Sequence, residues 1–211
     1  MANIEAIYKA VLEGDAAAAK AGVEAALKAG ATADLIMNEG LIGAMTEVGR
    51  LFEAGEYYVP EMLISARAMQ NGLGVLKPYL AQSGVKAAGK VAIGTVKGDL
   101  HDIGKNLVGM MLEGAGFEIK DLGTDVSPEK YVAAVKADGV DVVALSALLT
   151  TTMPNMLATI EALKAAGLRD KVKVIIGGAP VTEAYAKQIG ADGYSADASA
   201  ATRLARSLMA G

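Results

Sequence analysis

The sequence has no cysteine and only one histidine among its 211 residues. Without cysteine the chain has no disulfide, no thiolate nucleophile and no thiolate metal site. This composition fits a reducing compartment, and we expect a cytoplasmic protein. A transition metal held by the protein itself must use the single histidine, His101, or carboxylates.

Basic clusters, aromatic residues and long apolar runs are also scarce. Aromatic residues make up 4% of the chain, and the formal net charge is -4. Because phosphate binding needs clustered Lys and Arg, we expect no nucleic acid partner. No run approaches the roughly 18 uninterrupted apolar residues of a membrane span, and the N-terminus lacks a basic segment followed by an apolar one, so we expect no membrane partner.

The first part of the chain has the pattern of a helical domain. Up to about Leu80, apolar residues recur at spacings that alternate between three and four, which is typical of helix faces packed on other helices. Breaks around Gly14, Gly30 and Gly55 divide the region into four helices joined by short turns. We therefore predict a small antiparallel four-helix bundle over residues 1–81.

The sequence changes character after residues 82–89, a small and polar segment without periodicity that suits a flexible connector. Over residues 90–211, short β-branched runs alternate with amphipathic segments, the pattern of βαβ units around a parallel sheet. We predict a flavodoxin-like (Rossmann-type) doubly wound α/β domain with a five-stranded parallel sheet. The expected strands are Val91 to Val96, Phe117 to Leu122, Val140 to Ser146, Val172 to Ile176 and a short one near Gly193 and Tyr194; helices open near Gly104, Pro128, Thr151, Thr182 and Ala198.

Three polar or glycine-rich loops follow the first, third and fourth expected strands. They cover residues 94–101, 146–152 and 177–180. Because the carboxyl ends of parallel strands meet at one edge of a sheet, we expect these loops to converge on one rim, where doubly wound folds bind ligands. Glycine in such a loop admits a ligand close to the backbone, although each single glycine is equally well explained as a turn residue.

His101, in the first of these loops, is the best candidate for a metal ligand. Asp99 can bind one imidazole nitrogen, fix the tautomer and leave the other nitrogen for a ligand. A lone histidine is more often a hydrogen-bonded structural residue, but its position directly after a strand favours the functional interpretation. Hydroxyls at Thr150, Thr151 and Thr152 can bind a ligand or carry a proton relay from Asp99, whereas capping of the next helix explains at least one of them.

These residues form a spacing pattern that resembles the cobalamin-binding domains of cobalamin-dependent methionine synthase. Over the whole chain, the sequence resembles the small corrinoid proteins of methyltransferase systems. In the N-terminal half, the segments Met45 to Phe52 and Tyr57 to Met62 look like the helical cap over the upper face of the corrin. The three parts of the pattern are Asp99-x-His101-x-x-Gly104, Ser146-x-Leu148 and Gly177-Gly178.

The resemblance implies roles on the lower face of the cofactor. His101 would ligate cobalt and displace the cofactor's own dimethylbenzimidazole, which gives the base-off, His-on form. Asp99 would hydrogen-bond the far nitrogen, and Thr152, at the position of a serine in the family, would complete a catalytic relay. Ser146 would contact the displaced base, and Tyr194 would help to line the slot for the nucleotide tail. The implied cofactor-binding set also includes Asp102, Gly104, Leu148, Thr150, Gly177 and Gly178.

The resemblance also implies that the helical cap shields the upper face and the methyl group. The residues concerned are Tyr57, Tyr58, Val59 and Met62. Bundle packing explains Met62 equally well, because a methionine at helical spacing is usually a core residue. The two tyrosines lie in a break between helices and are less easily explained in that way.

The function implied by the resemblance is that of a methyl-carrying corrinoid subunit of a multi-component methyltransferase, itself a non-catalytic carrier. Its partners would be a donor-specific methyltransferase, a corrinoid:acceptor methyltransferase acting on tetrahydrofolate or a thiol, and a reductive activator. The methyl donor stays open among methanol, methylamines, aryl methyl ethers and betaines. The alternatives are a flavin-binding or nucleotide-binding protein and a cobalamin-binding or flavin-binding regulatory or sensory module, since similar sheets carry those ligands at the same rim.

Overall fold

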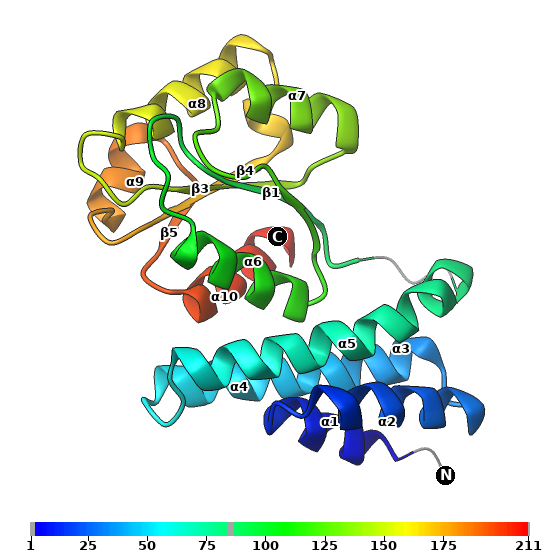
Figure 1. Ribbon diagram of the computed structural model, residues 1–211. Helices are drawn as coiled ribbons and strands as arrows, with labels where there is room; N and C mark the ends of the chain where they lie inside the picture. Colours follow the sequence, from blue (N-terminus) through cyan, green and yellow to red (C-terminus); the bar gives the residue numbers. More distant parts are fainter. Residues whose placement is uncertain (1–2, 84–86, 211) are drawn as a thin grey trace. The chain divides into compact units, whose positions relative to one another are not determined.

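The computed structural model describes residues 3–83 and 87–210, and the chain divides into two compact units (Figure 1). The first unit holds helices α1 to α5 together with residues 114–116, and the second holds the sheet and the remaining helices. Each unit is described by itself.

Four helical segments form the first unit within the described residues, as the sequence pattern predicts. Asn3 and Asp15 cap the first two, because their side chains accept hydrogen bonds from Ala6 N and Ala18 N at 3.1 and 2.9 Å. Glycines with φ between +73° and +83° follow α1, α2 and α4 and end these helices. The elements are α1 (Ile4–Leu12), α2 (Ala16–Lys28), the continuous segment of α3 (Ala33–Leu35), η1 (Ile36–Ile42) and α4 (Gly43–Glu53), and α5 (Val59–Ser83).

Two details of this unit differ from the sequence pattern. The third segment contains a π-helix, η1, between α3 and α4, where the sequence predicts one regular helix. Helix α5 continues to Ser83, so the first residues of the expected connector 82–89 are helical. Residues 84–86 of that connector lie outside the described residues.

The second unit is the predicted doubly wound parallel sheet. In the described part of the chain the sheet has five parallel strands in the order β2-β1-β3-β4-β5. Strand bounds differ from the predicted ones by one or two residues. The elements are β1 (Lys90–Thr95), α6 (Ile103–Gly114), β2 (Glu118–Asp121), α7 (Pro128–Asp138), β3 (Val142–Ser146), α8 (Pro154–Ala165), η2 (Arg169–Lys171), β4 (Lys173–Gly177), α9 (Glu183–Ile189), β5 (Gly193–Ser195) and α10 (Ala198–Ala210).

Helices cover both faces of the sheet. On one face, alternate strand residues such as Val143 and Leu145 pack with Tyr131 of α7, Met156 of α8 and Ile189 of α9 in one buried apolar cluster. Helices α6 and α10 cover the other face (Figure 1). A continuous apolar core on one side fixes the register of each strand, since a shift of one residue would turn every side chain to the opposite face.

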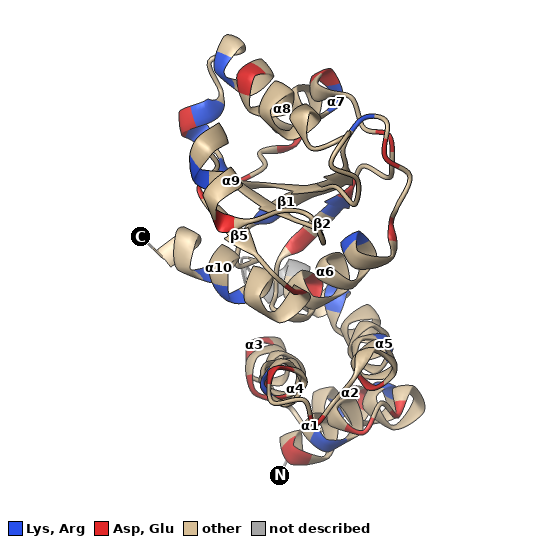
Figure 2. Ribbon diagram, turned by 90° about the vertical axis from the view of Figure 1, so that its left-hand side faces the viewer, with Lys and Arg blue, Asp and Glu red and all other residues tan. Residues whose placement is uncertain are grey.

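Charged residues lie mainly on the outer helices. Lys and Arg are interspersed with Asp and Glu over the helices of the second unit (Figure 2). Among the helices that the structure describes, none combines the length and the apolar character needed to cross a bilayer.

Candidate functional site

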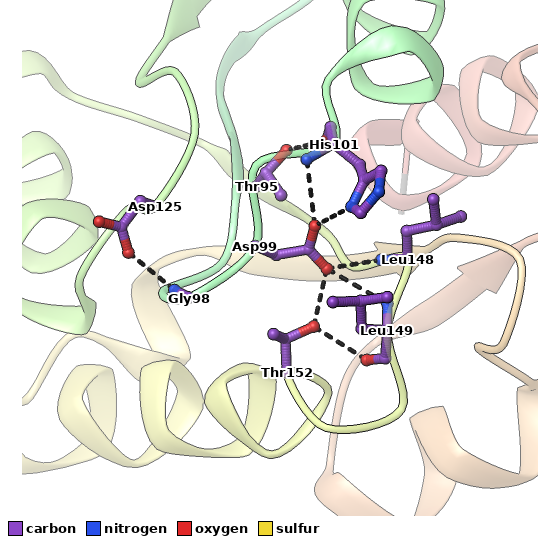
Figure 3. Close-up of polar contacts among 8 residues, drawn as sticks. All are labelled: Thr95, Gly98, Asp99, His101, Asp125, Leu148, Leu149 and Thr152. Carbon is purple, nitrogen blue, oxygen red and sulfur yellow. Dashed lines mark hydrogen bonds and ion pairs between the residues drawn. The ribbon is translucent and has the colours of Figure 1, made fainter.

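The buried carboxylate of Asp99 is the centre of the site (Figure 3). Its Oδ1 lies 2.7 Å from Nδ1 of His101 and accepts the His101 backbone N–H at 3.1 Å. Its Oδ2 accepts the backbone N–H groups of Leu148 and Leu149 at 2.8 and 3.2 Å, and the hydroxyl of Thr152 lies 2.7 Å away. The loops after the first and third strands therefore converge as expected, and the side chain of Asp99 joins them.

Hydrogen bonding keeps Asp99 ionised. Burial raises the pKa of the Asp99 carboxyl, but hydrogen bonds from Thr152, His101 and the backbone of Leu148 outweigh burial, so the net pKa lies well below the ordinary value. A carboxylate only accepts hydrogen bonds, so Nδ1 of His101 carries the proton. In the neutral imidazole Nε2 then keeps its lone pair, and half of the side chain is exposed. The arrangement presents Nε2 as a free ligand at the rim.

Thr152 faces Asp99 and does not cap the helix that follows. Its hydroxyl lies 2.8 Å from the carbonyl oxygen of Leu149 as well as close to Asp99. Helix α8 begins two residues later, at Pro154, where a missing N–H costs nothing. Thr150 is exposed on the turn before this helix. Of the two interpretations of Thr152, helix cap or relay partner of Asp99, the structure shows no cap and places the hydroxyl where a relay partner would lie.

The start of helix α6 is stabilised by contacts between residues that are close together in the sequence. Asp102 accepts the backbone N–H of Asn106 at 2.8 Å through its carbonyl oxygen and the Asn106 side-chain amide at 3.1 Å through Oδ2. Gly104 lies in the first helical turn, and a Cβ at that position would meet open space. The hydroxyl of Thr95 donates to the carbonyl oxygen of His101 at 2.8 Å and so ties the histidine to the end of β1. The sequence interpretation missed Thr95, which only its place at a strand end could have indicated.

A row of small side chains crosses the sheet at its carboxyl edge. Strand pairing puts Thr95 beside Ser146, Ser146 beside Gly177, and Gly177 beside Ser195. Ser146 alternates with Leu145 and Ala147, which belong to the cluster under α7, α8 and α9, so the row faces the α6 and α10 side. Three hydroxyl-bearing residues and a glycine therefore lie on this face beside the histidine loop.

The two glycines after β4 bring neighbouring loops together. A Cβ on Gly178, whose φ is +131°, would lie 1.9 Å from the carbonyl oxygen of Ala147. At Gly177 a Cβ would approach the carbonyl oxygen of Ser195 to 3.2 Å. Only glycine fits at 178, because both the backbone conformation and the close approach exclude a side chain.

Tyr194 does not share the row that contains Ser146. It pairs with Ile176 and packs against the apolar cluster on the opposite face, under α7, α8 and α9. The expected contact of the Tyr194 side chain with a slot on the row's face is therefore not supported. Ser195, the next residue, takes the corresponding position, because successive side chains of a strand point to opposite faces.

The cap residues belong to the first unit and are placed only within it. The hydroxyl of Tyr57 donates to the carbonyl oxygen of Leu12 at 3.1 Å, which is a structural contact. Tyr58 is 65% exposed and Val59 38%, whereas Met62 on α5 is 1% exposed, as its bundle interpretation requires. Tyr58 and Val59 are thus the two that present apolar surface.

The chemistry of these residues fits a corrinoid. A corrin ring supplies cobalt with four nitrogens of its own, so a site that offers a single imidazole fits this group. Apolar side chains flank the free imidazole: Leu100, Ile103, Leu148 and Leu149 are 73%, 78%, 42% and 42% exposed. Such a rim suits the face of a large apolar ring, and the adjacent row of small residues offers room for a polar tail.

Comparison with known proteins supports this assignment. Residues 3–77 and 89–203 each match a family model described as a B12 binding domain. Dimethylamine corrinoid protein 3 of Methanosarcina acetivorans is 41% identical over 212 residues, which cover 99% of this chain and 100% of that protein. Dimethylamine corrinoid protein 1 of the same organism is 46% identical over 83% of both chains.

Solved structures give the same result. A cobalamin-binding protein from Desulfitobacterium hafniense superposes with a TM-score of 0.82 and 34% identity over 99% of both chains. The methanol:cobalamin methyltransferase complex MtaBC from Methanosarcina barkeri matches with a TM-score of 0.87 and 32% identity over 99% of this chain and 80% of that chain. The two family models together span nearly the whole chain, one in each unit, and the chain therefore belongs to the B12-binding corrinoid protein family.

Proposed function

We propose that this chain is the methyl-carrying corrinoid subunit of a multi-component methyltransferase, with His101 as the lower ligand of cobalt through Nε2. The observation that carries the proposal is the Asp99–His101 pair, in which a buried carboxylate holds Nδ1 at 2.7 Å and leaves Nε2 free at the rim. Cobalamin, when bound, supplies a cobalt centre that takes up and gives away a methyl group.

The chain's own residues would tune how readily the imidazole binds and leaves. The Asp99 carboxylate would hold the proton at Nδ1 and so keep Nε2 of His101 available to cobalt. Thr152 would complete the relay, since its hydroxyl lies 2.7 Å from Oδ2 of Asp99 and stabilises the ionised form of that group. The exposed leucines around His101 would exclude water from the ring face.

A methylated amine is the donor class to test first. Two relatives named as dimethylamine corrinoid proteins are 46% and 41% identical to this chain. The partners would be a donor-specific methyltransferase, an acceptor methyltransferase acting on tetrahydrofolate or a thiol, and a reductive activator. The likeness to one component of a methanol:cobalamin methyltransferase complex supports the first of these partners.

The test uses the fact that the chain has one histidine. Untagged protein labelled with ¹⁵N-histidine carries the label in a single imidazole. After loading with hydroxocobalamin and reduction to the cobalt(II) state, we expect spin-resonance coupling to ¹⁵N in the wild type and its loss in His101→Ala. Coupling to benzimidazole nitrogen in the wild type would overturn the ligation proposal.

The carrier role needs a separate assay. The loaded protein, reduced chemically to cobalt(I), is incubated with dimethylamine and a dimethylamine methyltransferase, or with methanol and a methanol methyltransferase, and methylation is followed by absorbance. We expect methylation by the amine enzyme and a large loss in His101→Ala. The proposed function would be overturned if the protein mixed with hydroxocobalamin came off a desalting column colourless, while a separate sample mixed with flavin retained the flavin.

A further inference from the structure

Asp125, in the loop between β2 and α7, contacts the backbone on both sides of the Gly98–Asp99 segment. Its Oδ1 accepts the backbone N–H of Gly98 at 2.7 Å, and its own N–H donates to the carbonyl oxygen of Asp99 at 3.0 Å. Figure 3 shows this contact on the side of the loop away from the His101 imidazole. One residue therefore brackets the segment that carries the buried carboxylate.

The backbone of Asp125 is adapted to this contact. Its φ is +50°, and it is the only non-glycine residue with a positive φ in the described parts of the chain. Asp and Asn are among the residues that tolerate this conformation best. Val126, the next residue, bridges to Val96 and donates to the carbonyl oxygen of Thr95 at 3.0 Å, which fixes the loop beside the end of β1.

The Gly98–Asp99 segment needs such a restraint because the backbone dihedral angles of Gly98 are intrinsically free to change. Its φ is +81°, and glycine populates positive and negative φ about equally. A change in the Gly98 dihedrals would swing the Asp99 side chain away from Nδ1 of His101. The contacts from Leu148 and Thr152 hold the far end of that side chain, and the Asp99 N–H donates to the carbonyl oxygen of Val96 at 3.1 Å. Asp125 adds the contacts to the Gly98 N–H and to the Asp99 carbonyl oxygen, the two ends of the segment that can rotate.

We infer that Asp125 is a positioning residue for His101, which acts by fixing the Gly98–Asp99 backbone so that the carboxylate meets Nδ1 and Nε2 stays free. The importance of this role for cobalt ligation rests on the function proposed above. The effect of Asp125 on the position of the His101 imidazole proton does not rest on that function, because it can be measured in the protein without cofactor.

Three variants at this position separate the two features of Asp125. Asp125→Asn keeps an oxygen acceptor and tolerates the positive φ, so it should behave as the wild type. Asp125→Gly keeps the φ without strain but removes the acceptor. Asp125→Ala removes the acceptor and disfavours the φ, so it should show the largest effect.

Asp141 offers a matched control at the opposite edge of the sheet. Its Oδ2 accepts the backbone N–H of Lys90 at 2.8 Å, and its own N–H donates to the carbonyl oxygen of Lys90 at 2.9 Å. Asp141→Ala therefore removes the same kind of carboxylate contact from the same unit, far along the strands from His101. It reports the general cost of such a loss.

The first readout is the ¹⁵N chemical shifts of the two ring nitrogens of His101 in protein without cofactor, which report the proton position. We expect the ratio of Nδ1–H to Nε2–H imidazole to fall about threefold or more in Asp125→Gly and Asp125→Ala. Hydrogen exchange of the Gly98 amide should rise about tenfold in the same variants. Asp125→Asn and Asp141→Ala should leave both measurements at wild-type values.

Two results would overturn the inference. One is a wild-type His101 ring spectrum in Asp125→Gly, which is strain-free and decides the matter if Asp125→Ala does not fold. The other is an equal change in Asp141→Ala. If the ring spectrum responds as expected while the cobalamin-loaded wild type shows no imidazole coupling, the positioning role stands and the ligation proposal fails.

Discussion

Replacement of Asp99 by asparagine should move the proton on His101 from Nδ1 to Nε2. An amide has one accepting oxygen and one donating nitrogen, whereas the carboxylate accepts on both sides. With the oxygen at the Oδ2 position, the contacts from Leu148, Leu149 and Thr152 survive and the amide nitrogen faces His101. The opposite orientation would set that nitrogen against three donors, so the first orientation is favoured.

The magnitude follows from the contacts that are lost. In the favoured orientation the amide nitrogen faces the His101 backbone N–H and the protonated Nδ1, two donors that formerly had an acceptor. Loss of a hydrogen bond to a charged group costs about 1.5–3 kcal/mol. That free energy corresponds to about a 10- to 150-fold fall in the ratio of imidazole-ligated to unligated cobalt. Because asparagine is isosteric with aspartate, the fold should be retained.

Two measurements check this prediction. In protein without cofactor, the ¹⁵N shifts of the single imidazole should change to those of the Nε2–H form. In cobalamin-loaded protein, the ratio of ¹⁵N-coupled to uncoupled cobalt(II) should fall by the stated factor, with Asp141→Asn as a control for the same change of charge. Unchanged ring shifts and unchanged coupling in Asp99→Asn would refute the reasoning that Asp99 sets the tautomer.

Three further predictions concern stability. Thr152→Val should lower the free energy of unfolding by about 1–2 kcal/mol in urea titrations, and Thr152→Ser should restore most of it, because only the serine keeps a hydroxyl near Asp99; equal losses would contradict this. Gly178→Ala should lower the free energy of unfolding by about 3 kcal/mol or more, since the new Cβ would lie 1.9 Å from a carbonyl oxygen. Gly104→Ala, whose Cβ meets open space, should lower it by less than about 1 kcal/mol. Similar melting temperatures for the two variants would contradict this prediction. Because the folded-state pKa of Asp99 is depressed, its ionised form stabilises the protein above the ordinary carboxyl pKa of about 3.9, and this contribution is lost as the pH falls toward the lower folded value; the stability difference between wild type and Asp99→Asn should therefore narrow between pH 5 and pH 3.

The fold could be predicted because its signals are local and repetitive. Alternating β-branched runs and amphipathic segments indicate the parallel sheet, and the observed order of strands, β2-β1-β3-β4-β5, is that of the flavodoxin-like arrangement. Glycine breaks mark the helix ends of the first unit, as at Gly14 and Gly55. The π-helix Ile36–Ile42 has no such signal, since its apolar spacing is that of an ordinary helix and the extra residue per turn is set by packing.

Part of the candidate site could also be predicted. Asp99 and His101 are two residues apart at a strand end, and their contact is a local one. The contact of Asp99 with Thr152 spans 53 residues. Parallel strands bring their carboxyl ends to one edge, which predicts that the two loops meet, whereas the choice of Thr152 among the hydroxyls comes from the resemblance to the corrinoid family. Tyr194, which the resemblance implies as a slot residue, shows the limit of a transferred assignment, because a shift of one residue changes the face of the sheet on which a side chain lies.

The place of Asp125 follows from the order of the strands rather than from any local pattern. Strand β1 lies between β2 and β3, so the loop after β1 has one neighbouring loop on each side. The loop after β3 binds the carboxylate of Asp99 through Leu148 and Thr152, and the loop after β2 binds the backbone of the same residue through Asp125. Helices α6 and α8 lie on opposite faces of the sheet (Figure 1), and the side chain of His101 at this edge is half exposed. An aspartate in a glycine-containing loop is otherwise an ordinary turn residue, so the strand order is what points to the positioning role inferred for Asp125.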